Sequence, residues 1–128
     1  MQNLITIAFA GALGTLARYG LSGLSHRLLG ERFAWGTLVV NLLGCLVLGL
    51  LMQAVLESAA VPRAYRAPLA IGFCGAFTTF STFGYETLRF IQDGAWAYAL
   101  GNISANVVLG LAMVYAGFVL GRLLTGGA

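Results

Sequence analysis

Charged residues are scarce in this chain. They make up 9% of the 128 residues, whereas hydrophobic residues make up 59%. Lysine does not occur, so all seven basic residues are arginines. A mean hydropathy of +0.89 lies far outside the usual range of soluble domains. The composition therefore excludes an ordinary soluble domain and indicates an integral membrane protein.

Residues that build catalytic and metal centres are also few. His26 is the single histidine, and we expect it in a loop. Cys45 and Cys74 fall within expected spans, where thiols usually pack, so no disulfide framework is indicated. The sequence offers no nucleophile–base pair, metal-ligand cluster or phosphate-binding glycine loop. It therefore predicts neither an enzyme nor a nucleotide-driven machine.

Charges divide the chain into four long uncharged stretches, at residues 1–17, 33–56, 67–85 and 94–121. Each can cross the hydrocarbon core as a helix of about 20 residues, the first by continuing past Arg18. We expect an all-α integral membrane protein with one four-helix domain over residues 1–128. Its transmembrane helices are predicted at about 4–24, 35–55, 67–91 and 95–124.

Arginines are distributed evenly between the two sides of such a bundle. One side holds Arg63, Arg66 and Arg122; the other holds Arg27, Arg32 and Arg89, with Arg18 embedded near it. Because an excess of Arg and Lys marks cytoplasmic loops, this balance predicts insertion in both orientations. The net charge of +3 fits contact with lipid headgroups. No nucleic-acid partner is expected, because no basic cluster is interleaved with aromatics.

Four short helices fill their own centre with side chains, so a polar pathway requires association of copies. Glycines on the first, second and fourth helices favour close helix contacts in lipid. Two oppositely inserted copies would pair about an axis in the membrane plane. We therefore expect an antiparallel homodimer.

Three asparagines lie at membrane depth. Asn41 is in the middle of the second span, and Asn102 and Asn106 lie one turn apart on one face of the fourth. Buried asparagines commonly hydrogen-bond between helices, so a purely structural role is the alternative to a binding role. The neighbouring third span favours a binding role.

The third span combines hydroxyl groups, aromatic rings and glycines. Phe77, Phe80 and Phe83 repeat every three residues, a spacing that also suits simple packing. Gly72, Gly75 and the β-branched threonines weaken a regular helix and predict a break in mid-membrane. Freed carbonyls can bind a cation, while aromatic ring edges and amide donors can meet a small anion.

The run from Gly72 to Phe83, the segment from Gly11 to Tyr19, and Asn41 shortly before Gly44 closely resemble the Fluc (CrcB-type) fluoride channels of microbial membranes. The resemblance spans essentially the whole chain. It implies a dual-topology antiparallel homodimer in the cell (inner) membrane, with two pores for passive fluoride export. It also implies a structural central sodium ion, held here by the main-chain carbonyls of Gly75 and Thr78.

The same resemblance assigns further roles. Phe80 and Phe83 match phenylalanines beside the fluoride path, and Asn41 matches a pore-lining asparagine. The remaining expected pore residues are Thr79, Ser81, Thr82, Asn102 and Asn106. Arg18 resembles a basic residue near a pore mouth and Glu86 an acidic residue after the motif; snorkelling to headgroups and a paired helix-end charge are the respective alternatives.

Three other functions compete with a channel. A small multidrug exporter or a fluoride/proton antiporter also suits four helices, but proton coupling needs an embedded carboxylate. The first, second and fourth helices contain none before their ends, and Glu86 is a poor substitute. A non-transporting membrane assembly subunit would leave Asn41 and Phe80 dispensable.

Overall fold

The computed structural model describes residues 1–57 and 59–126, so positions 58, 127 and 128 of the expected domain lie outside the described residues. Every regular element in the described part is helical. Four spans are long and apolar enough to cross a membrane: Gln2–Leu29, Trp35–Leu56, Arg63–Gln92 and Trp96–Thr125. The prediction of an all-helical, multi-pass membrane protein is confirmed.

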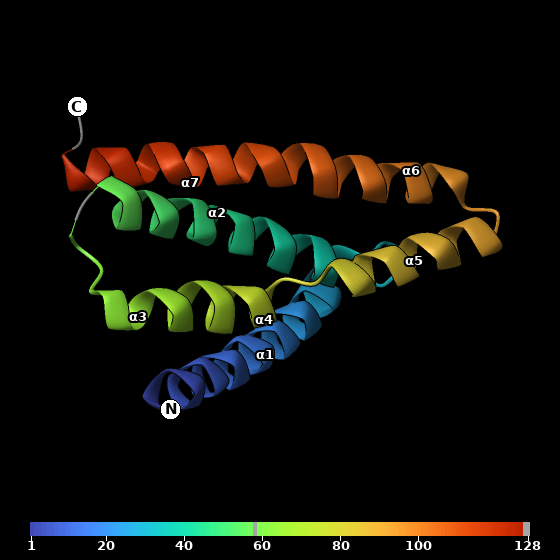
Figure 1. The fold of residues 1–128 in the computed structure, drawn as a ribbon. Helices are drawn as coiled ribbons and strands as arrows, with labels where there is room; N and C mark the ends of the chain where they lie inside the picture. The colour runs from blue at the N-terminus through green and yellow to red at the C-terminus, as the bar shows by residue number, and fades with distance from the viewer. Residues whose placement is uncertain (58, 127–128) are drawn as a thin grey trace.

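The first two spans are single helices, α1 (Gln2–Leu29) and α2 (Trp35–Glu57). The third comprises α3 (Arg63–Ala67), the π-helix η1 (Pro68–Cys74), α4 (Gly75–Phe77) and α5 (Phe80–Gln92). The fourth comprises α6 (Trp96–Ser104), the π-helix η2 (Ala105–Leu109) and α7 (Gly110–Thr125). Figure 1 shows the fourth span as one long rod beside α2, with α1 crossing obliquely near α4.

Glycines let α2 and α7 approach until their backbones touch. A Cβ on Gly117 would overlap the carbonyl oxygen of Leu46, and a Cβ on Gly49 would overlap that of Val114. In lipid, such close van der Waals contact is a main source of helix association. Gly49 and Gly117, which were expected to promote helix contacts, therefore bring together α2 and α7 of the same chain.

A second glycine contact joins α1 to the third span. A Cβ on Gly14 would overlap the carbonyl oxygen of Phe73 in η1, and a Cβ on Gly72 of η1 would lie 2.8 Å from the carbonyl oxygen of Ile7 in α1. The remaining surface of α1 is largely uncovered, since only 6% of its most apolar window is buried within the chain.

The first helix is longer than predicted. It continues from the expected end near Leu24 to Leu29, because no glycine or proline lies between Leu24 and Gly30, whose φ of 93° ends the helix. His26 therefore lies in the last turn of α1, and its expected place in a loop is wrong.

The third span begins earlier than predicted. Pro62 precedes its first helical residue, Arg63, while Pro68 lies inside the span at the start of η1. Pro68 has no N–H to donate to a preceding turn, and the chain adopts the wider π-helical turn there. The third span then leaves helical geometry at Thr78 and Thr79, where both residues have extended backbone angles.

We expect Gly117→Ala to lower the free energy of unfolding in detergent by about 1–3 kcal/mol, because the new methyl group pushes α7 away from α2. Gly101→Ala is the matched control: nothing lies within 4 Å of a Cβ there, so stability stays equal or rises slightly. Thermal unfolding followed by circular dichroism measures both variants. Equal melting temperatures for Gly117→Ala and the parent chain would contradict the backbone contact.

Candidate ion-binding site at the third span

Asn41 of α2 holds the peptide groups on both sides of Thr79. Its Oδ1 accepts from the Thr79 N–H at 2.8 Å, and its Nδ2 donates to the Thr79 carbonyl at 3.1 Å. One side-chain amide thus replaces the helical partners that the extended backbone has lost. Because unpaired peptide groups are costly away from water, this pair of bonds stabilises the departure from helical geometry.

The amide of Asn41 also begins a chain of side-chain hydrogen bonds. Its Nδ2 donates to Asn106 Oδ1 at 3.0 Å, and Asn106 Nδ2 donates to the carbonyl and Oδ1 of Asn102 at 2.9 and 3.0 Å. Asn102, which is fully buried, donates to Thr87 Oγ1 at 3.0 Å, and that hydroxyl donates to the Phe83 carbonyl at 2.8 Å. This asparagine network joins the second, third and fourth spans.

Thr87 was not among the residues singled out from the sequence. It is buried and lies one helical turn after Phe83, on the side of α5 that meets α6. Its spacing of four residues from Phe83 is the only sequence signal for its position. Nothing in the sequence pairs it with Asn102, because that contact depends on how α5 and α6 fold back on each other.

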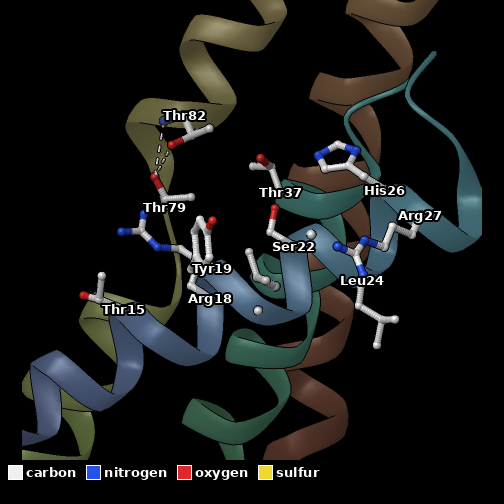
Figure 2. A pocket seen from close by; sticks show the side chains of 13 residues that line it. Thr15, Arg18, Tyr19, Ser22, Leu24, His26, Arg27, Thr37, Thr79 and Thr82 are labelled. Carbon is white, nitrogen blue, oxygen red and sulfur yellow. Dashed lines mark hydrogen bonds between the residues drawn. The ribbon is translucent and has the colours of Figure 1, made fainter.

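Hydroxyl groups cap the start of α5. Thr79 Oγ1 accepts from the Thr82 N–H at 3.3 Å and donates to Thr82 Oγ1 at 2.9 Å, as the dashed lines in Figure 2 show. Ser81 Oγ lies 3.5 Å from Thr79 Oγ1. The N-terminal turn of α5 therefore carries three of the predicted hydroxyls within one connected group.

Phe80 and Phe83 lie side by side, with ring centroids 5.5 Å apart. Phe83 is buried, but Phe80 is 82% exposed in the single chain. Both rings line a hollow of about 320 Å³ together with Asn41, Thr78 and Asn106. The structure thus brings the predicted phenylalanines and two of the predicted asparagines to one hollow.

The carbonyls of Gly75 and Thr78 have lost their regular helical donors. In an uninterrupted helix they would accept from the N–H groups of Thr79 and Thr82. Those two groups instead donate to Asn41 Oδ1 and Thr79 Oγ1. Gly75 and Thr78 also line the 320 Å³ hollow, so the expected pair of carbonyl ligands fits the local hydrogen bonding.

Arg18 and Glu86 have different surroundings. Arg18 lines a second hollow of about 690 Å³, where α1 faces Thr79 and Thr82 (Figure 2). Glu86 accepts a 2.7 Å hydrogen bond from the Thr37 hydroxyl of α2, and its Oε2 is buried without a partner among the described residues. Glu86 lies within α5, inside the third span, which continues to Gln92.

Comparison with known proteins identifies the family. The family described as CrcB-like protein, Camphor Resistance (CrcB), matches residues 5–118. A Dehalococcoides mccartyi protein named fluoride-specific ion channel FluC is 50% identical over 124 residues, which cover 97% of this chain and 95% of the relative. A relative of the same name from Solidesulfovibrio magneticus is 48% identical over 97% of this chain and 99% of its own length. With these relatives and this four-span fold, the chain belongs to the CrcB family of ion channels and not to a family of enzymes.

Proposed function

We propose that this chain forms a fluoride-selective channel for passive fluoride export across the cell (inner) membrane. The observation that carries the proposal is the two-point hydrogen bonding of Asn41 to Thr79 beside Phe80 and Phe83. It gathers neutral donors and aromatic rings at one hollow, in a span apolar enough to cross the membrane. The names of the relatives supply the ion, since they are fluoride-specific channels.

The chemistry of these donors suits a small, strongly hydrated anion. Amide N–H groups, hydroxyls and aromatic ring edges can each replace a water molecule of the ion without adding a full positive charge. An ion held only by neutral groups leaves quickly, which a channel requires. Donors fixed at fluoride-sized spacing would hold larger halides poorly, and this is the proposed basis of selectivity.

A second copy of the chain completes the proposed pore. The 690 Å³ hollow holds polar groups of Arg18, Thr79 and Thr82 on an open side of the single chain. Polar groups facing hydrocarbon are costly, so a protein surface that covers them is favoured over lipid. Because the arginines are balanced between the two sides, we propose an antiparallel homodimer, in which two equivalent hollows give two pores.

The carbonyls of Gly75 and Thr78 are the proposed ligands of a structural sodium ion at the centre of the dimer. Both have lost their helical donors, and carbonyl oxygens suit a hard cation. A bound cation would supply positive charge to otherwise unpaired carbonyls. The extended residues Thr78 and Thr79 lie near the middle of the span from Arg63 to Gln92, so we place this interruption in mid-membrane.

Fluoride efflux from liposomes tests the function directly. In vesicles loaded with potassium fluoride and containing only this purified chain, valinomycin should trigger rapid efflux at a fluoride electrode, because passive conduction needs a compensating potassium current. Vesicles loaded with chloride should show none. Efflux that needs a proton gradient instead of valinomycin would indicate an antiporter, and no efflux under either condition would overturn the proposal.

Asn41→Ala should lower fluoride efflux at least tenfold, because it leaves the Thr79 peptide groups unpaired and removes a donor from the hollow. Ser104→Ala is the matched control. This substitution removes an exposed hydroxyl group from the fourth span, between Asn102 and Asn106 in the sequence. The variant should conduct as the parent chain does. Parental efflux in a correctly assembled Asn41→Ala protein would argue against the assigned role.

Removal of sodium tests the cation. We expect prolonged dialysis into sodium-free buffer to lower both the fluoride efflux and the melting temperature, the latter by about 5 °C, because a ligand that binds only the folded state stabilises it. Sodium chloride added back should restore both, whereas choline chloride should not. Unchanged stability and efflux without sodium would remove the ion from the proposal.

Reporter fusions test the orientation. A C-terminal green fluorescent protein, which is active inside the cell, and a C-terminal alkaline phosphatase, which is active outside, should both give signal because copies insert both ways. In a chain with four spans the C-terminus lies on the same side as Arg63 and Arg66. Removing both arginines should therefore abolish the fluorescence, since that side becomes the external one. A parent chain that activates one reporter alone would contradict dual topology.

A further inference from the structure

The asparagine network begins and ends on the backbone of the third span. At one end the Thr79 N–H, which can only donate, donates to Asn41 Oδ1 at 2.8 Å. At the other end the Phe83 carbonyl, which can only accept, receives the proton of the Thr87 hydroxyl at 2.8 Å. The side chains between these two ends are, in the order of donation, Asn41, Asn106, Asn102 and Thr87. Donation therefore runs in a single direction from one backbone group to the other.

The hydroxyl of Thr87 selects the orientation of the Asn102 amide. The oxygen and the nitrogen of an asparagine amide are nearly the same size, so the partners of the amide decide which end faces which neighbour. The proton of Thr87 Oγ1 is given to the Phe83 carbonyl, so this oxygen faces Asn102 as an acceptor. Among the residues that the structure describes, it is the one acceptor of Asn102 Nδ2, and the Asn102 side chain is fully buried.

The orientation selected at Asn102 extends to the hollow beside Phe80 and Phe83. With its Nδ2 towards Thr87, Asn102 presents Oδ1 to Asn106, whose Nδ2 donates to it at 3.0 Å. Asn106 then presents its own Oδ1 to Asn41 Nδ2, also at 3.0 Å. Asn41 and Asn106 line the hollow of about 320 Å³, whereas Thr87 lies outside its lining. Thr87 can therefore act on the hollow only through other side chains.

The fold holds Thr87 against Asn102. A turn that contains Gly94, with a φ of 72°, brings α6 back against α5, as Figure 1 shows. About one helical turn nearer to this turn, Phe90 of α5 packs on Tyr98 of α6 with ring centroids 5.6 Å apart. The aromatic pair fixes the separation of the two helices, so the buried hydroxyl and the buried amide meet in one geometry.

We propose that Thr87 is a positioning residue of the fluoride path, an inference that rests on the fluoride function proposed above. Its hydroxyl fixes the orientation of the Asn102 and Asn106 amides and so holds the donor of Asn41 in place at the hollow. Without the hydroxyl, Asn102 Nδ2 loses its acceptor and the amide is free to turn. A turned amide points its nitrogen at the nitrogen of Asn106, and two donors that face each other leave both unsatisfied.

Substitutions of Thr87 separate its hydroxyl from its packing. In the liposome assay, Thr87→Val, which keeps the branched shape, should lower fluoride efflux at least about fivefold, because a buried amide loses its acceptor. Thr87→Ser, which keeps the hydroxyl and lacks the methyl group, should stay within about twofold of the parent chain. Thr87→Ala differs from Thr87→Ser by the hydroxyl alone and should be the slower of that pair. Efflux in the reverse order, with parental flux in Thr87→Val, would overturn the proposal.

Thr125→Val is the matched control. The Thr125 hydroxyl donates to the Gly121 carbonyl four residues earlier, as the Thr87 hydroxyl does to Phe83, but no asparagine donates to it among the described residues. This variant should conduct as the parent chain does. A loss equal to that of Thr87→Val would assign the effect to the bond within the helix and would contradict a role of the asparagine network.

Nuclear magnetic resonance tests the positioning role without transport. The chain has four asparagines, so labelling asparagine with nitrogen-15 gives four side-chain amide groups, which single substitutions assign. We expect Thr87→Val to shift the side-chain signals of Asn102, Asn106 and Asn41 and to leave that of Asn3 unchanged, whereas Thr87→Ser should keep all four near their parental positions. A shift confined to Asn102 would overturn the proposal, since the orientation would then not reach the hollow.

An Asn102→Ala background tests whether Thr87 acts through Asn102. Thr87→Val should add less than about a twofold loss of efflux there, because the side chain that it would release is already absent. A further fivefold loss would overturn the route through Asn102 and leave the channel intact. A parent chain without efflux would overturn the fluoride function, and the asparagine signals would then decide the positioning role alone.

Discussion

Every backbone N–H and carbonyl within the membrane must find a partner in the protein, and the third span meets this demand without a continuous helix. At Thr79 the side chain of Asn41 takes the place of the missing helical turn, accepting from the N–H and donating to the carbonyl. The extended backbone, the cap of α5 by the Thr79 hydroxyl and the freed carbonyls of Gly75 and Thr78 all depend on that substitution. A single amide thus supplies the hydrogen bonds that an interrupted helix cannot supply for itself.

The asparagine network connects this interruption of the third span to two other spans. Asn106 and Asn102 link α2 to the fourth span, and Thr87 links the fourth span to α5. The π-helical turn η2, which begins beside these residues, opens the regular ladder of the fourth span at the same level. The side-chain amides of Asn41, Asn102 and Asn106 all donate to acceptors within the protein, so the network holds its shape through its own hydrogen bonds.

Hydropathy was sufficient to predict four spans, since long apolar stretches separated by arginines leave few alternatives. The spacing of Asn102 and Asn106 also correctly placed both on one face of a helix, where they now hydrogen-bond to each other. Tertiary contacts were not accessible in the same way. Asn102, the partner of Thr87, lies on α6, beyond the turn that follows α5. His26 was expected in a loop because the first helix was predicted to end near Leu24, whereas the helix ends at Leu29, before Gly30. The roles assigned to pore residues by resemblance stay predictions.

The identity of the competing acceptors decides how an anion can move through such a site. To bind Asn41 or the hydroxyl of Thr79, an anion must displace neutral oxygens, namely the Thr79 carbonyl, Asn106 Oδ1 or Thr82 Oγ1. Neutral acceptors are weaker than a small anion in a low-dielectric setting, so the exchange is feasible at each step. A carboxylate in the same position would hold the donors too strongly. Glu86 is instead one helical turn after Thr82, where it accepts from the Thr37 hydroxyl and leaves the donors of Asn41 and Thr79 free of a carboxylate.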